Sequence, residues 1–339
     1  MPGYLNTASF GVPCPEAVQA VKEVTAAWET GTLSFGSWFS DAQRARASIA
    51  RLLGVAPVQV ALGTSTSLLL SSIAASLPPH ARVLAPVDEH NSNLIPYLNQ
   101  AHRGVTVELA PLAELARRVQ SSTTVVSCSA VQSLTGEVAN IEEIQAATKQ
   151  HGAIFCLDVS QACGWLPLSG ASADVIVCSL YKWLCAPLGA AFLTMTEDMA
   201  ERFRPSTPSW AASFDPLAAP YGTQFRSAPG ARKFDTVPNL MSLLAARRSI
   251  DAITELGVDS IQKHNVMLAN RFRNGMQMNS SNSAIVTVPW EGGAAHLAQA
   301  GVRATEWRGI VRLSFHLYNS ADDVDRALAI FAKCRIADH

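Results

Sequence analysis

The sequence predicts an α/β fold, in which a doubly wound, mostly parallel sheet is joined to a smaller α+β lobe at the C-terminal end. Between about residues 58 and 195, short strand-like runs alternate with helical patterns, as in sheets built from strand–helix–strand units. The runs are almost continuously apolar, which indicates strands covered by helices on both faces. Because the chain has 339 residues, we expect two unequal lobes rather than one core.

The helices between these strands have recognisable ends. Pro78 and Pro79 should stop a helix that begins at Thr66, because proline cannot continue the backbone hydrogen bonding. Asn140 should cap the helix that follows it, whose acidic first turn favours the helix dipole. The expected strands are 58–62, 82–87, 105–109, 123–129, 153–158, 175–179 and 190–195, and the expected helices are 66–77, 93–101, 112–119 and 141–151.

The chain changes character after residue 204. Residues 204–232 hold five prolines and show little periodicity, which predicts a long loop that could reach a partner subunit. The expected later elements are helices at 240–256 and on to 274, strands at 284–288 and 310–315, and a helix at 322–334. We place a large domain at 15–235 and a small domain at 1–14 and 236–339.

Composition excludes several kinds of partner. Charged residues make up 16% of the chain, the formal net charge is -1, and no basic run of five or more occurs. Nucleic acid and anionic membranes both favour basic proteins, so neither is an expected partner. No apolar run approaches the ~20 residues that span a bilayer, and the N-terminus does not resemble a signal peptide.

The seven cysteines are an odd number and lie mostly in apolar runs, where cysteine behaves as a small buried hydrophobe. No Cys-x-x-Cys pair occurs, so we expect no metal site. A reducing compartment is the simplest interpretation, and we therefore expect a cytoplasmic protein.

Two neighbouring buried strands lead to an aspartate and a lysine. The strand 153–158 ends on Asp158, and the strand 175–179 points at Lys182, which aromatic residues flank. Pyridoxal phosphate (PLP) requires such a pair, because a lysine forms a Schiff base with its aldehyde and a carboxylate keeps its pyridine nitrogen protonated. Taken singly, Asp158 could cap a helix and Lys182 could extend from a sheet edge into solvent.

The segment Gly63–Ser67, between a strand and a helix, could form a phosphate cradle from backbone N–H groups and short hydroxyls. The alternative is an ordinary helix start capped by Thr66. No Gly-Lys-Ser/Thr follows, so this is not a Walker loop. The chain also lacks a Gly-x-Gly-x-x-Gly fingerprint, which counts against a nicotinamide dehydrogenase.

Further polar residues lie beside the predicted strands. His90 could lie on a cofactor ring and move protons, or it could simply be solvated. Gln161 is close enough to Asp158 to donate to the phenolic oxygen of PLP, and Ser179 could contact its phosphate. Arg312 lies in a strand-like run and could bind a substrate carboxylate bidentately, or form a surface ion pair.

These residues occur in a distinctive order. The motifs are Tyr4-Leu-Asn-Thr-Ala, Gly63-Thr-Ser-Thr, Glu89-His90, Asp158-x-x-Gln161, Ser179-x-x-Lys182 and Arg312-x-Ser-x-x-x-Tyr-Asn. Across essentially the whole chain this order resembles the class V aminotransferase family, which includes cysteine desulfurases, C–S lyases and isopenicillin N epimerase. The resemblance implies the fold type I architecture of PLP-dependent transferases and a homodimer with its active sites at the interface.

The resemblance also implies a role for each matching residue. Lys182 would form the Schiff base, Asp158 would pair with the pyridinium, and His90 would stack on the ring as the second catalytic residue. Gln161 would contact the ring hydroxyl. The implied phosphate contacts are Thr64, Ser65 and Ser179, with Thr236 completing the site of the other protomer, and the implied substrate contacts are Arg312, Asn6 and Gln132.

Some positions depart from the family pattern. Tyr181 stands where the desulfurases usually have histidine, and Gln132 or Ser133 replaces an asparagine common near this turn. Group desulfurases of the family carry a persulfide-forming cysteine shortly before the final arginine, but residues 300–308 hold none. Cys334 lies beyond that arginine in a predicted helix, so a sulfur-relay desulfurase is not expected.

The motifs therefore predict an enzyme that removes the Cα proton of a PLP-bound amino acid. Our leading hypothesis is β-elimination from a cysteine-type amino acid, as in C–S lyases, and the alternative is amino transfer or epimerisation. A PLP-fold scaffold without turnover is the non-enzyme alternative, against which the intact Lys182 and Asp158 argue. We expect the aromatic stretch 35–39, Trp210 and Tyr221 to shape the substrate pocket.

Overall fold

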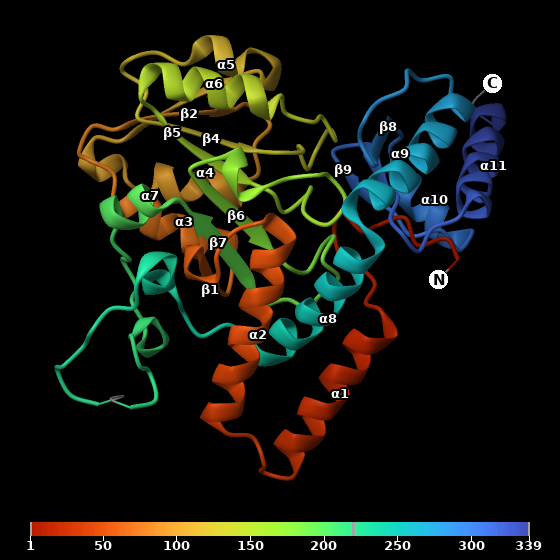
Figure 1. Ribbon diagram of the computed structural model, residues 1–339. Coiled ribbons are helices and arrows are strands. Elements are labelled where there is room, and N and C mark those ends of the chain that lie inside the picture. Colours follow the sequence, from red (N-terminus) through yellow and green to blue (C-terminus); the bar gives the residue numbers. More distant parts are fainter. Residues whose placement is uncertain (1, 219–220, 338–339) are drawn as a thin grey trace.

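The computed structural model describes residues 2–218 and 221–337 and contains the predicted sheet (Figure 1). Seven strands lie in the order β1-β7-β6-β5-β4-β2-β3. The pairs from β3 to β6 are parallel, whereas β7 is antiparallel to both of its neighbours. The strands are β1 (Val60–Gly63), β2 (Arg82–Pro86), β3 (Thr106–Ala110), β4 (Val125–Ser129), β5 (Ile154–Asp158), β6 (Val175–Ser179) and β7 (Ala191–Met195).

The helices of the larger lobe lie around this sheet, except the first helix, which lies farther from the strands and packs against the last helix of the lobe (Figure 1). They are α1 (Pro15–Glu29), α2 (Phe35–Leu53), α3 (Thr66–Ala75), α4 (Asn91–Leu98), α5 (Leu115–Arg118), α6 (Ile141–His151), α7 (Glu197–Arg202) and α8 (Leu240–Leu256). The predicted cap is confirmed for α6, because Asn140 accepts a hydrogen bond from Glu143 N at 3.3 Å. The helix expected at 112–119 is instead a 3-10 turn followed by the short α5. Leu112 and Leu115 are both buried, and 3-10 geometry places residues three apart on one side.

Alternate residues of the central strands pack into separate hydrophobic clusters on opposite faces of the sheet. In β5, Phe155 and Leu157 belong to one cluster, and Ile154 and Cys156 belong to the other. The prediction that both faces are covered is therefore confirmed for the central strands. β3 is different, because it is an edge strand whose residues are mostly exposed.

The smaller lobe has its own antiparallel sheet, in the order β8-β10-β9. Its elements are α9 (Val258–Gly275), β8 (Ile285–Pro289), α10 (Gly293–Gln299), β9 (Thr305–Trp307), β10 (Ile310–Ser314) and α11 (Ala321–Ala337). The N-terminal segment joins this lobe through bridges from Tyr4 to Arg303 and from Asn6 to Ser314. Leu5 accordingly lies in the core of the smaller lobe.

Helix α8 lies where the two lobes meet. It packs along α1 and α2, and its buried residues Leu243, Ile250 and Ile253 belong to a core cluster of the larger lobe. The division of the chain into a domain of residues 15–235 and a second domain from the remainder stays a prediction. No helix within the described residues is both long and apolar enough to cross a bilayer.

The proline-rich region 204–232 is mostly irregular, as predicted, but it includes 3-10 turns at Trp210–Ala212 and Gly230–Phe234. Pro220 lies outside the described residues. The Trp210 ring packs against Phe35 and Trp38 of α2, with ring centroids 5.6 Å and 5.5 Å apart. This aromatic group borders α2 rather than the carboxyl edge of the sheet.

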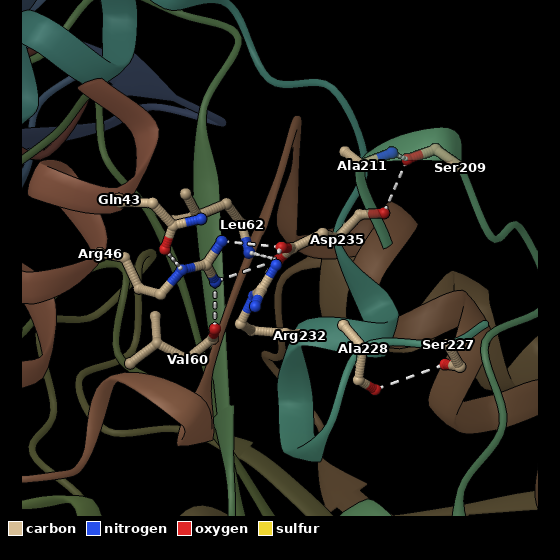
Figure 2. A network of polar contacts seen from close by, with 10 residues as sticks. All are labelled: Gln43, Arg46, Val60, Leu62, Ser209, Ala211, Ser227, Ala228, Arg232 and Asp235. Atoms are coloured by element: carbon tan, nitrogen blue, oxygen red, sulfur yellow. Dashed lines mark hydrogen bonds and ion pairs between the residues drawn. The ribbon is translucent and has the colours of Figure 1, made fainter. Parts of the chain in front are cut away.

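A buried ion pair fastens α2 to the edge strand β1 and to the segment before α8 (Figure 2). Arg46 Nη2 lies 2.7 Å from Asp235 Oδ2, and each side chain is 3% exposed. Asp235 Oδ1 also accepts from Leu62 N at 2.8 Å, and Arg46 donates to the Val60 carbonyl. Arg232 Nε lies 3.9 Å from the same carboxylate, so one buried anion serves two guanidinium groups.

We expect Asp235→Ala to lower the free energy of unfolding by about 3–5 kcal/mol, because it leaves buried guanidinium groups without a carboxylate. Urea unfolding followed by circular dichroism measures the loss. The control is Asp325→Ala, which removes the partner of Arg271 where both side chains are 51% exposed and solvent screens the pair, so its loss of stability should be much smaller. Equal losses in the two variants would contradict the structural role of the buried pair.

Candidate active site

Polar side chains at the carboxyl ends of the sheet strands surround an open cavity of about 320 Å³. β4 ends in Ser129, β5 in Asp158 and β6 in Ser179, and parallel strands bring such ends to one edge. The remaining lining residues are Thr66, His90, Ser92, Ser133, Ser160, Gln161, Tyr181 and Lys182. The cavity thus brings together five predicted site residues, namely Lys182, Asp158, Gln161, Ser179 and His90.

Lys182 lies in the turn that follows β6 and is 8% exposed, so it does not extend into solvent. Its carbonyl accepts a hydrogen bond from Cys185 N at 3.1 Å, which closes the turn. Burial lowers the pKa of the Lys182 amine, Asp158 opposes this shift, and the Arg312 guanidinium adds to it. A lowered pKa leaves more of the amine unprotonated, which is the form that acts as a nucleophile or base.

Asp158 is the last residue of β5 and is 5% exposed. Its Oδ1 accepts from Ser160 N at 2.7 Å, but turns rather than a helix follow, so the alternative of a helix cap does not hold. The carboxylate forms no ion pair with any residue that the structure describes. Because an unpaired buried charge is costly, a cationic ligand group beside Asp158 would be stabilised.

Hydroxyl groups and the start of α3 form the phosphate-like end of the cavity. Thr66 Oγ1 lies 3.5 Å from Ser179 Oγ, and Ser160 Oγ accepts from Ser179 N at 2.9 Å. The helix cap is Ser65, whose Oγ accepts from Leu68 N, rather than Thr66 as the alternative interpretation supposed. Neither Thr64 nor Ser65 lines the cavity, whereas Thr66 does.

His90 is the cap residue of α4, and its Nδ1 accepts a hydrogen bond from Ser92 N at 3.1 Å. The proton of the neutral ring is therefore on Nε2. Burial lowers the pKa of His90, and the charges of Lys182 and Arg312 lower it further against the opposing effect of Asp158. The ring thus stays neutral to lower pH than a solvated histidine.

The orientation of the Gln161 amide is set by Trp183. Trp183 Nε1 donates to Gln161 Oε1 at 2.8 Å, and because an indole can only donate, the amide NH₂ must face away from it. That NH₂ donates to the Ala8 carbonyl and to Ser133 Oγ, each at 3.0 Å. The orientation of the Gln161 amide is therefore fixed, and both of its N–H groups are engaged within the chain.

Arg312 reaches the same region from β10 of the smaller lobe. Its Nη1 donates to the Ser133 carbonyl at 2.7 Å and to Ser133 Oγ at 2.9 Å, and its Nη2 donates to Ser9 Oγ at 2.8 Å. Burial lowers the pKa of the Arg312 guanidinium to about 10. No described carboxylate lies within ion-pair distance, so the alternative of a surface ion pair does not hold. The Nε–H and one Nη2–H have no partner among the described residues, which leaves donors for a ligand carboxylate.

Three other predicted residues lie outside the cavity lining. Gln132 donates to Glu89 Oε2 at 3.2 Å. The buried Glu89 carboxyl group also accepts from Ser129 N, so its hydrogen-bond donors are neutral groups. Asn6 Oδ1 accepts from Thr305 Oγ1 at 2.6 Å. Thr236 donates its backbone N–H to the Leu62 carbonyl, and its Oγ1 has no partner among the described residues.

Several lining residues were not singled out from the sequence. Ser129 ends a predicted strand, so the rule that singled out Asp158 could also have found it. Thr66 is expected from the sequence only as a helix cap, but the helix begins at Thr66 with Ser65 as its cap, and the Thr66 side chain lines the cavity. Phe35, Trp38, Trp210 and Tyr221, expected to shape the substrate pocket, do not line this cavity in the described chain.

The residues present fit PLP. The buried Asp158 carboxylate has no cationic partner among the described residues, the Lys182 amine is shielded from water, and hydroxyls lie at the N-terminus of α3. These features suit, respectively, a protonated ring nitrogen, an aldehyde and a phosphate. His90 lines the same cavity as these groups.

Comparisons with known proteins agree with this geometry. The family profile "Aminotransferase class-V" matches residues 17–291. The chain is 24% identical over 306 residues to the uncharacterized aminotransferase YcbU of Bacillus subtilis, covering 84% of this chain and 81% of YcbU. It is 28% identical over 288 residues to a kynureninase of Deinococcus radiodurans, covering 79% of this chain and 70% of that protein.

Solved structures show the same fold. The cystine C–S lyase C-DES, in complex with cysteine persulfide, superposes with a TM-score of 0.88 at 17% identity and covers 98% of this chain and 97% of C-DES. Together, the fold and the site define a fold type I PLP-dependent enzyme. Because the family profile spans most of the sequence, the chain belongs to the class V aminotransferase family.

The lowered pKa of Lys182 generates a prediction for the cofactor-free protein. As pH rises, acylation of Lys182 by acetic anhydride should begin at lower pH than that of an ordinary lysine, whose pKa is about 10.4. Asp158→Asn removes the charge that raises this pKa, so its labelling curve should move to still lower pH. Mass spectrometry of the Lys182 peptide gives both curves. A shift to higher pH in the variant would contradict the proposed electrostatics.

Proposed function

We propose that this PLP-dependent enzyme is a C–S lyase that cleaves a cysteine-type amino acid or conjugate by β-elimination. The observation that carries the proposal is the composition of one cavity. Lys182 and Asp158 line it, and no described cysteine does. Arg312 lies beside the cavity, where it is hydrogen-bonded to Ser133. Such a site supplies a base, a cofactor anchor and a carboxylate clamp, but no thiol to receive sulfur.

PLP, when bound, supplies an aldehyde that condenses with amines and a ring that accepts electrons from Cα. We assign the ring nitrogen to Asp158, which lacks a cationic partner among the described residues. We assign the phosphate to Thr66 and Ser179 at the start of α3, and the predicted contacts Thr64 and Ser65 stay proposals. His90 is assigned to the ring face and Gln161 to the ring hydroxyl, which would replace Ser133 Oγ as the acceptor of one of its two N–H groups.

The amine of Lys182 is the proposed base for the Cα proton. Because burial lowers its pKa, the amine is available in its neutral form when the substrate arrives. Arg312 holds the substrate carboxylate through its unpartnered N–H groups and so fixes Cα relative to Lys182. Positioning by the clamp and proton removal by the lysine therefore act on the same carbon.

In the elimination, the Cα–H and Cβ–S bonds break and a Cα–Cβ double bond forms. The electron pair of the Cβ–S bond leaves on sulfur, and the proton taken by Lys182 can return to that sulfur. Water then hydrolyses the released enamine, so cysteine would give sulfide, pyruvate and ammonia. None of these steps needs an oxidant or a second thiol.

A sulfur relay is not favoured, because a relay needs a cysteine thiol near the departing sulfur. The described cysteines 128, 156, 163, 178 and 185 are buried, and Cys14 lies against Ser249 of α8. The side chain of Cys334 lies outside the described residues. The alternative function is amino transfer or epimerisation, and the similarity to the uncharacterized aminotransferase YcbU supports amino transfer.

We also propose a homodimer in a reducing, cytoplasmic compartment. Thr236 Oγ1 is buried without a partner among the described residues, and it lies by β1 rather than in the cavity of its own chain. This position supports the prediction that Thr236 contributes to the phosphate site of a second copy. Sedimentation of the holoenzyme would show a dimer, and a monomeric holoenzyme would rule this contact out.

The test of the function is product analysis. The purified protein should be yellow with PLP. Incubation should release pyruvate and ammonia together with sulfide from cysteine, cysteine persulfide from cystine, or a thiol from a cysteine conjugate. Lys182→Ala should lose the long-wavelength absorbance of bound PLP and all turnover. Amino transfer to a keto acid without sulfur release would exclude the lyase, and a colourless protein that gains no band with PLP would exclude the enzyme.

Arg312→Lys should raise KM for the amino acid by roughly 10- to 100-fold, because lysine keeps the charge but loses the bidentate geometry. Steady-state kinetics on the substrate identified by product analysis measures the change. Arg308→Lys is the matched control, since Arg308 is exposed on the turn between β9 and β10. An unchanged KM for Arg312→Lys would remove Arg312 from the substrate site.

A further inference from the structure

The carbonyl groups on either side of Lys182 are both hydrogen-bonded to segments outside the large sheet. Gly11 N donates to the Tyr181 carbonyl at 2.9 Å, and His316 Nε2 lies 3.1 Å from the Trp183 carbonyl. Gly11 belongs to the N-terminal segment that joins the smaller lobe, and His316 follows β10 of that lobe. The backbone of Lys182 is therefore held between two contacts made by the smaller lobe.

The chemistry of His316 makes its contact directional. A carbonyl can only accept, so Nε2 carries the proton, and Nδ1 of the neutral ring then accepts from Asn265 Nδ2 at 3.2 Å. His316 is fully buried, and burial lowers its pKa to about 3. The ring therefore keeps one protonation state across the physiological range and acts as a fixed donor.

The contact continues from Trp183 into the cavity. The His316 ring lies edge-on to the Trp183 indole, with centroids 5.1 Å apart and an interplanar angle of 76°. The same indole orients Gln161, as described above. A displacement of His316 would thus disturb both the residue next to Lys182 and the amide that faces the cavity.

We propose that His316 is a positioning residue for Lys182, whose Nε2–H holds the Trp183 carbonyl and so sets where the lysine amine lies in the cavity. Arg312 lies four residues earlier on the same segment. One short stretch of chain therefore fixes both the carboxylate clamp and the turn that carries the amine. The inference rests on the proposed function in one respect, namely that the Lys182 amine is the reactive group.

The test compares His316→Phe, which keeps the ring shape without a donor, with His316→Gln, whose amide N–H can replace Nε2. The matched control is His264→Phe, which removes a hydrogen bond of 3.1 Å to the Asn319 carbonyl in the same lobe and does not touch the Lys182 turn. Two quantities are measured, namely the rate of PLP release from the holoenzyme and amide hydrogen exchange in a peptide covering residues 180–186.

For His316→Phe we expect both rates to rise about 10-fold, which corresponds to about 1.4 kcal/mol, because the Trp183 carbonyl loses its imidazole donor and keeps only the weaker Cys185 thiol, at 3.7 Å. His316→Gln should return both rates to within about threefold of the wild type, which is well under 1 kcal/mol. His264→Phe should leave both rates unchanged. Rates for His316→Phe equal to those of wild type and control would overturn the proposal.

A second comparison applies if His316→Phe does not fold. His316→Asn has an amide too short to reach the Trp183 carbonyl, so it should release PLP faster than His316→Gln, and equal rates would overturn the proposal. Failure of the proposed function looks different. It would give a folded protein that turns over no amino acid while hydrogen exchange, measured without cofactor, still depends on residue 316.

Discussion

The active site depends on one backbone turn, which must hold an amine at the sheet edge in a space largely closed to water. Lys182 cannot be positioned by its own long side chain, so the turn around it is held by hydrogen bonds to Tyr181, Lys182 and Trp183 carbonyls. Gly11 is required there, because a Cβ at this position would lie 2.0 Å from the Lys182 carbonyl oxygen. A long side chain such as lysine has many rotamers, and a backbone held in one conformation limits the positions that its amine can reach.

Buried charges in this protein fall into two kinds. Arg46 and Asp235 satisfy one another inside the chain, and their bonds to β1 show a structural role. Asp158 and Arg312 lie beside the cavity without a counter-charge among the described residues, although each is hydrogen-bonded. Because a charge shielded from water without an internal partner is costly, we propose that these two groups serve ligands of opposite charge.

The strand ends were predictable because an apolar run and the polar residue that ends it are local features of the sequence. Asp158, Ser179 and Lys182 each lie at or just after the end of such a run. The phosphate-like end was harder to predict. The helix begins at Thr66 as expected, but which of the neighbouring hydroxyls caps it and which one faces the cavity depends on a backbone conformation that no local pattern specifies. Gln132 was assigned to the substrate from resemblance, yet the unpaired Glu89 carboxylate attracts it. The partners of Arg312 and His316 depend on how the lobes pack, which no local pattern encodes.

The contacts of Ala8 have a consequence for folding. Ala8 N donates to Ser314 Oγ across 306 positions of sequence, and the Ala8 carbonyl accepts from Gln161. Contacts between residues this far apart form late, because a long loop must close first. The neighbouring strands β4, β5 and β6 pair over much shorter separations, so we expect the sheet to form before the turn around Lys182 is fixed.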